Sequence, residues 1–421
     1  MKILFLNRFY FPDISATSQL LTDLAQHLAR AGWDVHVITG RQRYDDPRAR
    51  LPAQEVVEGV RIHRVPSTRF GRDAIAGRAV DSLTFCIAAA GRLLRLAIAG
   101  DIIVAKTDPP LVSVIGAWVA RRRGARLVNW IQDVFPEVAQ QLGVRLAGGA
   151  AGRIAKRLRD YSLRSSDANV VLSESMAVTL RRLVDRPTGP GLAIRTIHNW
   201  ADGSLVQAVP REANRMRVEW GLGDAFVLGY SGNIGRVHEF DTLLNAAERL
   251  RDVGDLAIVF SGTGKQADRI REEVDRRGLD RLFRFHGYQP RDRLGEALCV
   301  ADVHLVSLKP ELEGLVVPSK FYGIAAAARP ALFVGDAHGE LAALIRECGC
   351  GVVVAAGDDA ALARAIQELR SDRDSVRRMG NNARKLFESR FDKPRAMAAW
   401  EQIFGGICSL GAQFDEKGPT P

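Results

Sequence analysis

The stretch "DVHLVSLKPELEGLVVPSKFYGIAAAARPALFVGD", residues 302–336, contains one complete strand–helix–strand pattern. Its two ends, "DVHLVSL" and "PALFVGD", have the length and apolar content of buried strands. The alanine-rich segment between them has helical character and starts near Pro318, which suits the first turn of a helix because a missing N–H costs nothing there. A strand, a crossover helix and a second strand predict a parallel sheet.

The same alternation occupies both halves of the chain. Between several of the strands lie helical patterns that end in glycine, such as "SQLLTDLAQHLARAG" and "LVSVIGAWVARRRG". We therefore predict an α/β fold with two Rossmann-like, doubly wound parallel sheets. The expected strands are "KILFLN", "DVHVITG", "VRIHRV", "DIIVAK", "RLVNWI", "ANVVLS", "AIRTIHN", "FVLGYSG", "LAIVFSG", "LFRFHG", "DVHLVSL", "PALFVGD" and "CGVVVAAG".

The length of 421 residues exceeds what one ordinary core supports and suits two domains. Periodicity is lost in "HNWADGSLVQAVPREANR", which marks the boundary. We predict an N-terminal Rossmann-like domain over 1–205 and a C-terminal one over 206–390. A helix over 391–410 is expected to cross back to the first domain, and 411–421 to form a flexible tail.

Composition argues against several classes of protein. The five cysteines are scattered, and Cys348-Gly-Cys350 lacks the spacing of a redox or zinc pair, so a reduced cytoplasmic protein is expected. The longest apolar stretch, residues 83–100, carries Arg92 and Arg95 near its middle, which disfavours a membrane-spanning helix. The opening "MKILFLNRFY" has an apolar run too short for a signal peptide.

Positive charge is concentrated in the first half. Residues 1–200 hold 29 Lys and Arg against 17 Asp and Glu, whereas the remainder is close to neutral. This asymmetry predicts that the first domain faces an anionic partner. Aromatic residues do not interleave with the basic clusters, so we expect a membrane surface and no nucleic acid. Segments 92–100 and 152–164 mix basic and aliphatic residues as interfacial helices do; helices packed on their own sheet are the alternative.

Two glycine-rich loops open the second domain, "YSGNIGRVHEF" and "SGTGKQADRI". Each follows a strand and precedes a helix, so backbone N–H groups and the helix dipole favour an anion there. Arg236 and Lys265 add formal charge. Ordinary tight turns are the alternative for either loop. The first strand is followed by "NRFYFPDISATSQLL" and not by a Gly-x-Gly turn, so the sequence does not support NAD binding.

Lys320 is expected in the first turn of the helix that follows Pro318. A cation is unfavourable at the positive end of a helix unless an anion binds nearby. This placement predicts a phosphate site, with a solvated surface lysine as the alternative. Near the start of the chain, Thr17 and Ser18 are expected to cap the first helix.

These motifs together resemble the GT-B glycosyltransferases, and within them glycosyltransferase family 4 of the bacterial exopolysaccharide, O-antigen, capsule and colanic-acid type. The resemblance extends to about residue 405. It implies two domains facing a central cleft and a hexosyl- or N-acetylhexosaminyl-transferase that uses a nucleotide sugar, with UDP favoured, and retains the anomeric configuration. No metal or other cofactor is implied. The motifs that carry it are "FYFPDISATSQLLTDLAQHLARAGWDVHVIT", "NWIQDVFPE", "IHNWAD", "YSGNIG" and "EGLVVPSKFYGIAAAARP".

The resemblance also implies roles for individual residues. Arg236, Lys265 and Lys320 match positions that neutralise the donor diphosphate. Glu313 matches a glutamate that binds the donor sugar, with Glu311 as the alternative, and Asp133 would orient or deprotonate the acceptor hydroxyl. Further contacts to the nucleotide sugar are implied for Ser15, Ala16, Thr17, Gly232, Asn233, Gly235, Gly262, Gly264, Tyr288, Gly314, Leu315, Val316 and Ser319.

One position departs from the family pattern. Gly323 stands where relatives carry a second glutamate that grips the ribose, so how the ribose is held differs here. A lipid-linked saccharide is the expected acceptor, which would place the protein on the inner face of the cytoplasmic membrane. A UDP-N-acetylglucosamine 2-epimerase of GT-B type is the alternative function, and a catalytically inactive scaffold is opposed by the retained Arg236, Lys320 and Glu313.

Overall fold

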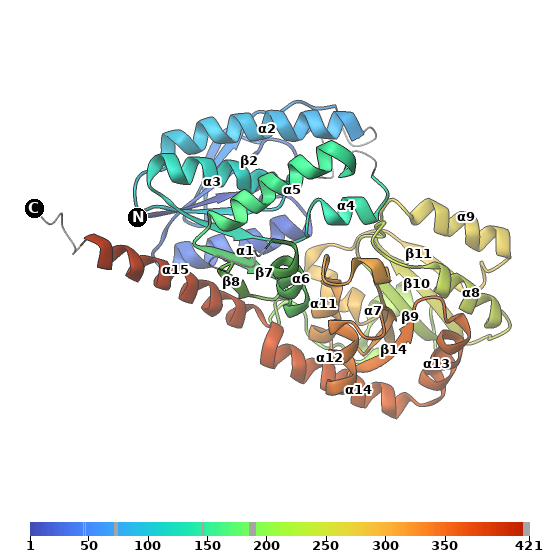
Figure 1. Cartoon of the computed structure of the whole chain (residues 1–421). Coiled ribbons are helices and arrows are strands. Elements are labelled where there is room, and N and C mark those ends of the chain that lie inside the picture. The colour runs from blue at the N-terminus through green and yellow to red at the C-terminus, as the bar shows by residue number, and fades with distance from the viewer. Residues whose placement is uncertain (45, 47, 71–74, 145–146, 185–190, 416–421) are drawn as a thin grey trace, which may run out of the picture. The chain divides into compact units, whose positions relative to one another are not determined.

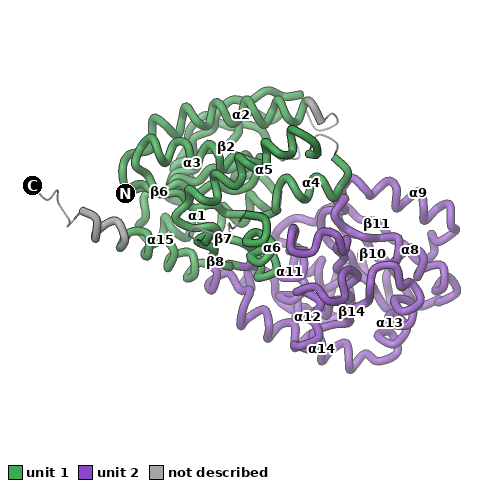
Figure 2. Tube along the Cα trace, in the orientation of Figure 1, with its two compact units in different colours: residues 1–197, 397–421 green, residues 198–396 purple. Residues whose placement is uncertain are grey.

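The computed structural model describes the chain except for residues 45, 47, 71–74, 145–146, 185–190 and 416–421. The chain divides into two compact units (Figure 2). Unit 1 comprises residues 1–197 and 397–421, and unit 2 comprises residues 198–396. Unit 1 is therefore built from both ends of the chain, whereas unit 2 is continuous in sequence.

Unit 1 contains an eight-stranded sheet in the order β3-β4-β2-β1-β5-β6-β7-β8. Neighbouring strands are parallel except for the antiparallel pair β3 and β4. The order reverses between β1 and β5, so the loops after these two strands flank the switch point of the sheet. The strands are β1 (Lys2–Leu6), β2 (Asp34–Gly40), β3 (Gln54–Val57), β4 (Val60–Val65), β5 (Ile102–Lys106), β6 (Arg126–Trp130), β7 (Ala168–Val171) and β8 (Ile194–Thr196).

Helices cover both faces of this sheet. Leu127 of β6 packs into an apolar cluster with residues of α2 and α3. Trp130, three positions later and so on the opposite face, packs edge-on against Trp400 of α15 at 4.8 Å between ring centroids. The helices of unit 1 are α1 (Ala16–Arg30), α2 (Ile75–Leu96), α3 (Val112–Arg123), α4 (Glu137–Gln141), α5 (Gly149–Arg164), α6 (Glu174–Val184) and, from Met397 onward, α15 (Lys393–Asp415).

Unit 2 contains a six-stranded, all-parallel sheet in the order β11-β10-β9-β12-β13-β14. This is the doubly wound order, with its switch point between β9 and β12. The elements are η2 (Arg211–Ala213), α7 (Arg215–Glu219), β9 (Phe226–Ser231), α8 (Asp241–Arg249), β10 (Leu256–Ser261), α9 (Ala267–Arg277), β11 (Phe283–His286), η3 (Arg291–Arg293), α10 (Leu294–Leu298), β12 (Val303–Ser307), η4 (Pro310–Leu312), α11 (Lys320–Ala326), β13 (Ala331–Gly335), α12 (Glu340–Cys348), β14 (Gly351–Ala355), α13 (Asp359–Ser371), α14 (Arg373–Leu386) and η5 (Phe387–Phe391) (Figure 1).

All thirteen expected strands are present, and the α/β class with two parallel sheets is confirmed. The sequence did not reveal β3. The expected capping of the first helix by Thr17 and Ser18 is wrong. Helix α1 begins at Ala16 with Ser15 as its N-cap, so these two residues lie inside the first turn.

Among the described helices, none combines the length and the apolar content needed to cross a membrane.

The C-terminal helix is expected to contribute strongly to the stability of unit 1. Trp400 is fully buried, and it also stacks on Phe404 at 5.6 Å. Replacing Trp400 with Ala should lower the free energy of unfolding of unit 1 by about 3 to 5 kcal/mol, because a large cavity is left beside Trp130. Denaturant unfolding followed by tryptophan fluorescence measures this change. Gln402→Ala, an exposed change on the same helix, should leave the unfolding midpoint in place.

Candidate active site

Two loops at the carboxyl edge of the unit 2 sheet pack backbone against backbone. The first follows β9 and the second follows β10. The N–H of Gly232 donates to the carbonyl of Ser261 at 2.8 Å, and the N–H of Ile234 donates to the carbonyl of Thr263 at 2.9 Å. The parallel register of β9 and β10 thus continues into their loops.

Glycine is required where these loops meet. Gly262 has a φ of +146°, and a Cβ there would lie 2.1 Å from the carbonyl oxygen of Gly232. A Cβ on Gly264 would lie 2.4 Å from the carbonyl oxygen of Ile234. Gly232 itself has a φ of +111°. Because no side chain fits, both loops present bare backbone, as a phosphate site requires.

The side chain of Gln266 fastens the two loops together. Its Nε2 donates to the carbonyl of Gly235 at 2.7 Å and to that of His238 at 3.1 Å. Arg236 and Lys265, one on each loop, are exposed. Their positive charges therefore flank the glycine backbone from the solvent side.

Lys320 reaches these loops from the other side of the switch point. It is the first residue of α11, two positions later than the start predicted from the sequence. Its Nζ lies 2.5 Å from Tyr230 Oη, 3.1 Å from the carbonyl oxygen of Asn233 and 3.0 Å from His238 Nε2. It also lies 4.2 Å from the ring centroid of Tyr230. One side chain thus joins the loop after β12 to the loop after β9.

The protonation of this cluster follows from its partners. His238 Nδ1 lies 2.6 Å from the carbonyl oxygen of Ser307 and must donate to it, which leaves Nε2 as the acceptor for Lys320. Burial and the neighbouring Lys320 lower the pKa of His238 to about 3, so the ring stays neutral. Burial lowers the pKa of Lys320 to about 7. Lys320 therefore gains or loses its charge close to neutral pH.

Glu313 lies at the N-terminus of α12. Its Oε1 accepts from the N–H of Glu340 at 3.0 Å, and a Cβ on Gly339 would lie 2.7 Å from its Oε2. The carboxylate therefore caps α12, where the helix dipole favours a negative charge. Glu311, the alternative sugar ligand, is exposed. Binding of a sugar by either glutamate stays a prediction.

The remaining predicted residues of unit 2 lie on loops at the same edge of the sheet. Tyr288, after β11, is half exposed. Gly314 has a φ of +70°, Leu315 is buried, Val316 is partly buried and Ser319 is exposed. Gly323 lies within α11, where a Cβ would meet Leu298 Cδ1 at an ordinary 3.5 Å. Sterics do not require glycine at position 323.

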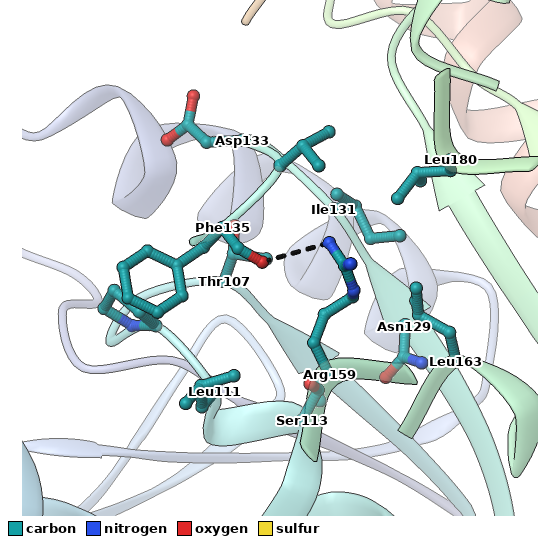
Figure 3. A pocket seen from close by; sticks show the side chains of 13 residues that line it. Thr107, Leu111, Ser113, Asn129, Ile131, Asp133, Phe135, Arg159, Leu163 and Leu180 are labelled. Atoms are coloured by element: carbon teal, nitrogen blue, oxygen red, sulfur yellow. Dashed lines mark hydrogen bonds between the residues drawn. The ribbon is translucent and has the colours of Figure 1, made fainter. Parts of the chain in front are cut away.

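Asp133 lies in unit 1, at the rim of a pocket that is partly open to solvent (Figure 3). The Asp133 side chain is exposed and points away from the pocket. Within the pocket, Arg159 donates to the carbonyl of Phe135 at 3.3 Å and to Glu137 at 2.9 Å. Since Glu137 balances the guanidinium charge, the pocket is not a phosphate site. Its other lining residues are Ala105, Thr107, Pro110, Leu111, Ser113, Asn129, Ile131, Val134, Leu163 and Leu180.

The loop of Ser15, Ala16 and Thr17 is also in unit 1, at the start of α1. The N–H of Ser15 donates to Asp13 Oδ1 at 2.8 Å. Lys106, buried at the end of β5, donates to the carbonyl of Thr17 at 2.9 Å. The start of α1 is thereby tied to β5 across the switch point of the sheet. The predicted residues of each unit thus follow strands of one sheet and lie at its carboxyl edge.

Sequence reasoning missed Tyr230, His238, Gln266 and Lys106. Tyr230 and His238 belong to a loop that was singled out, but their contact with Lys320 depends on the strand order. The charged residue at the end of the apolar run "DIIVAK" was the available signal for Lys106.

No cluster of three or more His, Cys, Asp or Glu in the described part of the chain could hold a metal ion. The Asp-x-Asp sequence at 372–374 serves α14 structurally. Asp372 caps the helix through the N–H of Ser375, and Asp374 pairs with Arg377.

Comparison with known protein families accounts for both units. The family described as "Glycosyl transferase 4-like domain" matches residues 17–200, and the family described as "Glycosyl transferases group 1" matches residues 212–386. The chain belongs to the GT-B glycosyltransferases. The enzyme class predicted from the sequence, a glycosyltransferase, is confirmed.

Relatives of known name agree with this family. The probable glycosyltransferase WbjE of Pseudomonas aeruginosa is 31% identical over 271 residues, which cover 64% of this chain and 66% of that protein. WcaI of Escherichia coli strain K12, whose name assigns it to colanic acid biosynthesis as a glycosyl transferase, is 28% identical over 369 residues. That match covers 82% of this chain and 86% of WcaI.

Solved structures show the same fold. Sucrose-phosphate synthase from Thermosynechococcus elongatus has a TM-score of 0.79 and 18% identity, covering 97% of this glycosyltransferase and all of that chain. HepE from Anabaena, solved in complex with UDP-glucose, has a TM-score of 0.70 and 17% identity, with coverage of 97% and 100%.

The packing of the glycine loops can be tested by one methyl group. Gly262→Ala adds a Cβ against the carbonyl of Gly232 at a φ that alanine rarely adopts, so the loops must separate. We expect the free energy of unfolding of unit 2 to fall by about 1 to 3 kcal/mol or more, as measured by denaturant unfolding. Gly254→Ala, at a position with open space, is the matched control and should be close to neutral. A stable Gly262→Ala protein would contradict the loop packing described.

Proposed function

We propose that this glycosyltransferase transfers a hexosyl or N-acetylhexosaminyl group from a UDP-sugar to a hydroxyl of a saccharide acceptor during bacterial surface polysaccharide synthesis. The observation that carries the proposal is the contact of Lys320 with the bare backbone of the loop after β9. The names of WbjE and WcaI and the UDP-glucose complex of HepE support the reaction class, the pathway and the nucleotide.

The chemical task of unit 2 is to stabilise charge on the departing diphosphate. The N–H groups of Gly232, Ile234 and Gly262 already donate to neighbouring carbonyls, so the other backbone N–H groups of the two loops are the candidate donors. These and the cations Arg236, Lys265 and Lys320 are held in place before the reaction. Neutral His238 fixes the Lys320 ammonium without adding a repelling charge. Since side chains and backbone supply this stabilisation, the reaction as proposed uses no metal. It proceeds with retention of the anomeric configuration.

The acceptor is assigned to unit 1. Asp133, with its exposed carboxylate beside the pocket, orients or deprotonates the acceptor hydroxyl. The acceptor proposed is a lipid-linked saccharide, and the enzyme would then work peripherally on the inner face of the cytoplasmic membrane. Glu313 or Glu311 binds the donor sugar in this scheme.

Nucleotide binding tests the proposal directly. In calorimetric titrations of the full chain, UDP should bind with micromolar affinity, and Lys320→Ala should weaken binding at least tenfold because a charge-assisted phosphate contact is lost. The control is Lys309→Ala, which removes one positive charge between β12 and α11 and should leave the affinity for UDP nearly unchanged. Binding of GDP instead of UDP would change the donor class. Binding of NAD alone, or of no nucleotide, would refute the proposal, and conversion of a UDP-sugar without any acceptor would indicate an epimerase.

The affinity for UDP should also depend on pH. The pKa of Lys320 is about 7 in the free protein, and a bound diphosphate favours the charged ammonium and raises it. The complex must then take up a proton, so affinity falls between pH 7 and 9, by up to about tenfold per unit. Titration in buffers of different ionisation enthalpy measures this proton uptake. Lys320→Gln should bind weakly with no uptake, and equal uptake by both proteins would exclude Lys320 as the source.

A further inference from the structure

Helix α2 exposes an apolar stripe along its outer side. Val80, Leu83 and Ile87, spaced three and four residues apart, are 41%, 60% and 65% exposed. The opposite side of the helix is fully buried through Phe85 and Leu93. One side of α2 therefore packs into the core of unit 1. Packing within unit 1 does not explain the apolar residues on the exposed side of the helix.

Helix α5 repeats this arrangement. Ile154, Leu158 and Tyr161 are 57%, 40% and 37% exposed at the same spacing. The exposed Arg153 and Arg157 lie beside them. Exposed aliphatic side chains flanked by arginines are typical of helices that lie in a membrane interface, where the aliphatic groups enter the lipid.

Helix α3 lies between the other two and contacts both (Figure 1). It exposes Trp118, which is 40% accessible and lies under the guanidinium of Arg122 at 4.9 Å. Arg121 and Arg123 follow at its exposed end. The outer sides of α2, α3 and α5 thus form one surface, here called the three-helix face.

The charge of the three-helix face is almost entirely positive. The three helices contain eleven Arg and Lys and two acidic residues, Asp81 and Asp160. Asp81 is buried, and Asp160 pairs with Arg159. Arg159 is itself buried and, like Lys156, pairs with Glu137, so these two add no charge to the face. Exposed aliphatic and aromatic side chains among unopposed arginines complement a surface that is negative outside and apolar beneath.

We propose that the three-helix face docks on a bilayer with anionic headgroups. Arginines at the headgroup level contribute about 1 kcal/mol each, and Trp118 and Tyr161 suit the boundary between headgroups and acyl chains. The surface differs from the segments expected from the sequence. Within 92–100 Leu93 is buried, whereas Arg95 and Ile98 are exposed. The stripe of Val80, Leu83 and Ile87 lies earlier in α2, and α3 is an added component.

The role of this docking in supplying the acceptor rests on the proposed function, but the docking itself does not. Helices α3 and α5 also supply walls of the pocket at whose rim Asp133 lies. A saccharide whose lipid stays in the bilayer would then meet Asp133 at the edge of the docked face.

Vesicle sedimentation with the full chain tests the docking. The protein should bind phosphatidylcholine vesicles that contain phosphatidylglycerol and should not bind vesicles of phosphatidylcholine alone. An apolar variant, Leu83→Ser with Ile87→Ser and Leu158→Ser, should lose at least tenfold in partition coefficient. A charge variant, Arg122→Gln with Arg157→Gln, should lose about fivefold for each arginine.

Matched changes in unit 2 control for surface substitution. The apolar control is Val218→Ser, since the Val218 side chain is 81% exposed. The charge control is Arg377→Gln with Arg378→Gln, which removes two exposed arginines of α14. Both should bind vesicles as the parent does. UDP titration should be unchanged in every variant, so a failure of nucleotide binding is separable from a failure of docking. The proposal is overturned if the parent binds no vesicles, if the three-helix variants bind equally well, or if the face instead makes a dimer that the apolar variant dissociates.

Discussion

The carbonyl of Gly232 and the α-carbon of Gly262 lie so close that no side chain fits between them, and the site of unit 2 depends on this approach. Backbone hydrogen bonds and the side chain of Gln266 then hold the two loops together beyond the ends of β9 and β10. In this arrangement Lys320 reaches across the switch point to the carbonyl of Asn233. Any side chain at Gly262 would lift one loop from the other and remove the surface that Lys320 meets.

The strands could be predicted because parallel strands are buried on both faces and so appear as continuous apolar runs. The one strand that the sequence did not predict, β3, lacks this burial. β3, with the sequence "QEVV", is an antiparallel edge strand whose residues alternate between exposed and partly buried, so it carries no apolar run. Its place in the sheet comes from pairing with β4, a contact that no local pattern records.

The candidate site could be predicted only in part. The misplaced charge of Lys320 was visible in the sequence because helix polarity is a local property. Its partners were not visible, since Tyr230 and His238 lie about ninety and about eighty residues earlier in the chain and meet it only through the strand order. For Glu313 the residue was predicted but its contact was not. A sequence motif marks the carboxylate but does not reveal that the same group caps α12.

The return of the chain to unit 1 affects how the protein is made. Trp400, Phe404 and Glu401 complete the surroundings of Trp130, Trp33 and His27, which were synthesised hundreds of residues earlier. While the ribosome is still translating α15, the first half of the chain lacks one wall of its core. Unit 2 is contiguous, so all of its strands have already been made by then. The half that leaves the ribosome first is therefore the half that finishes folding last, and until then it carries exposed aromatic surface that chaperones recognise.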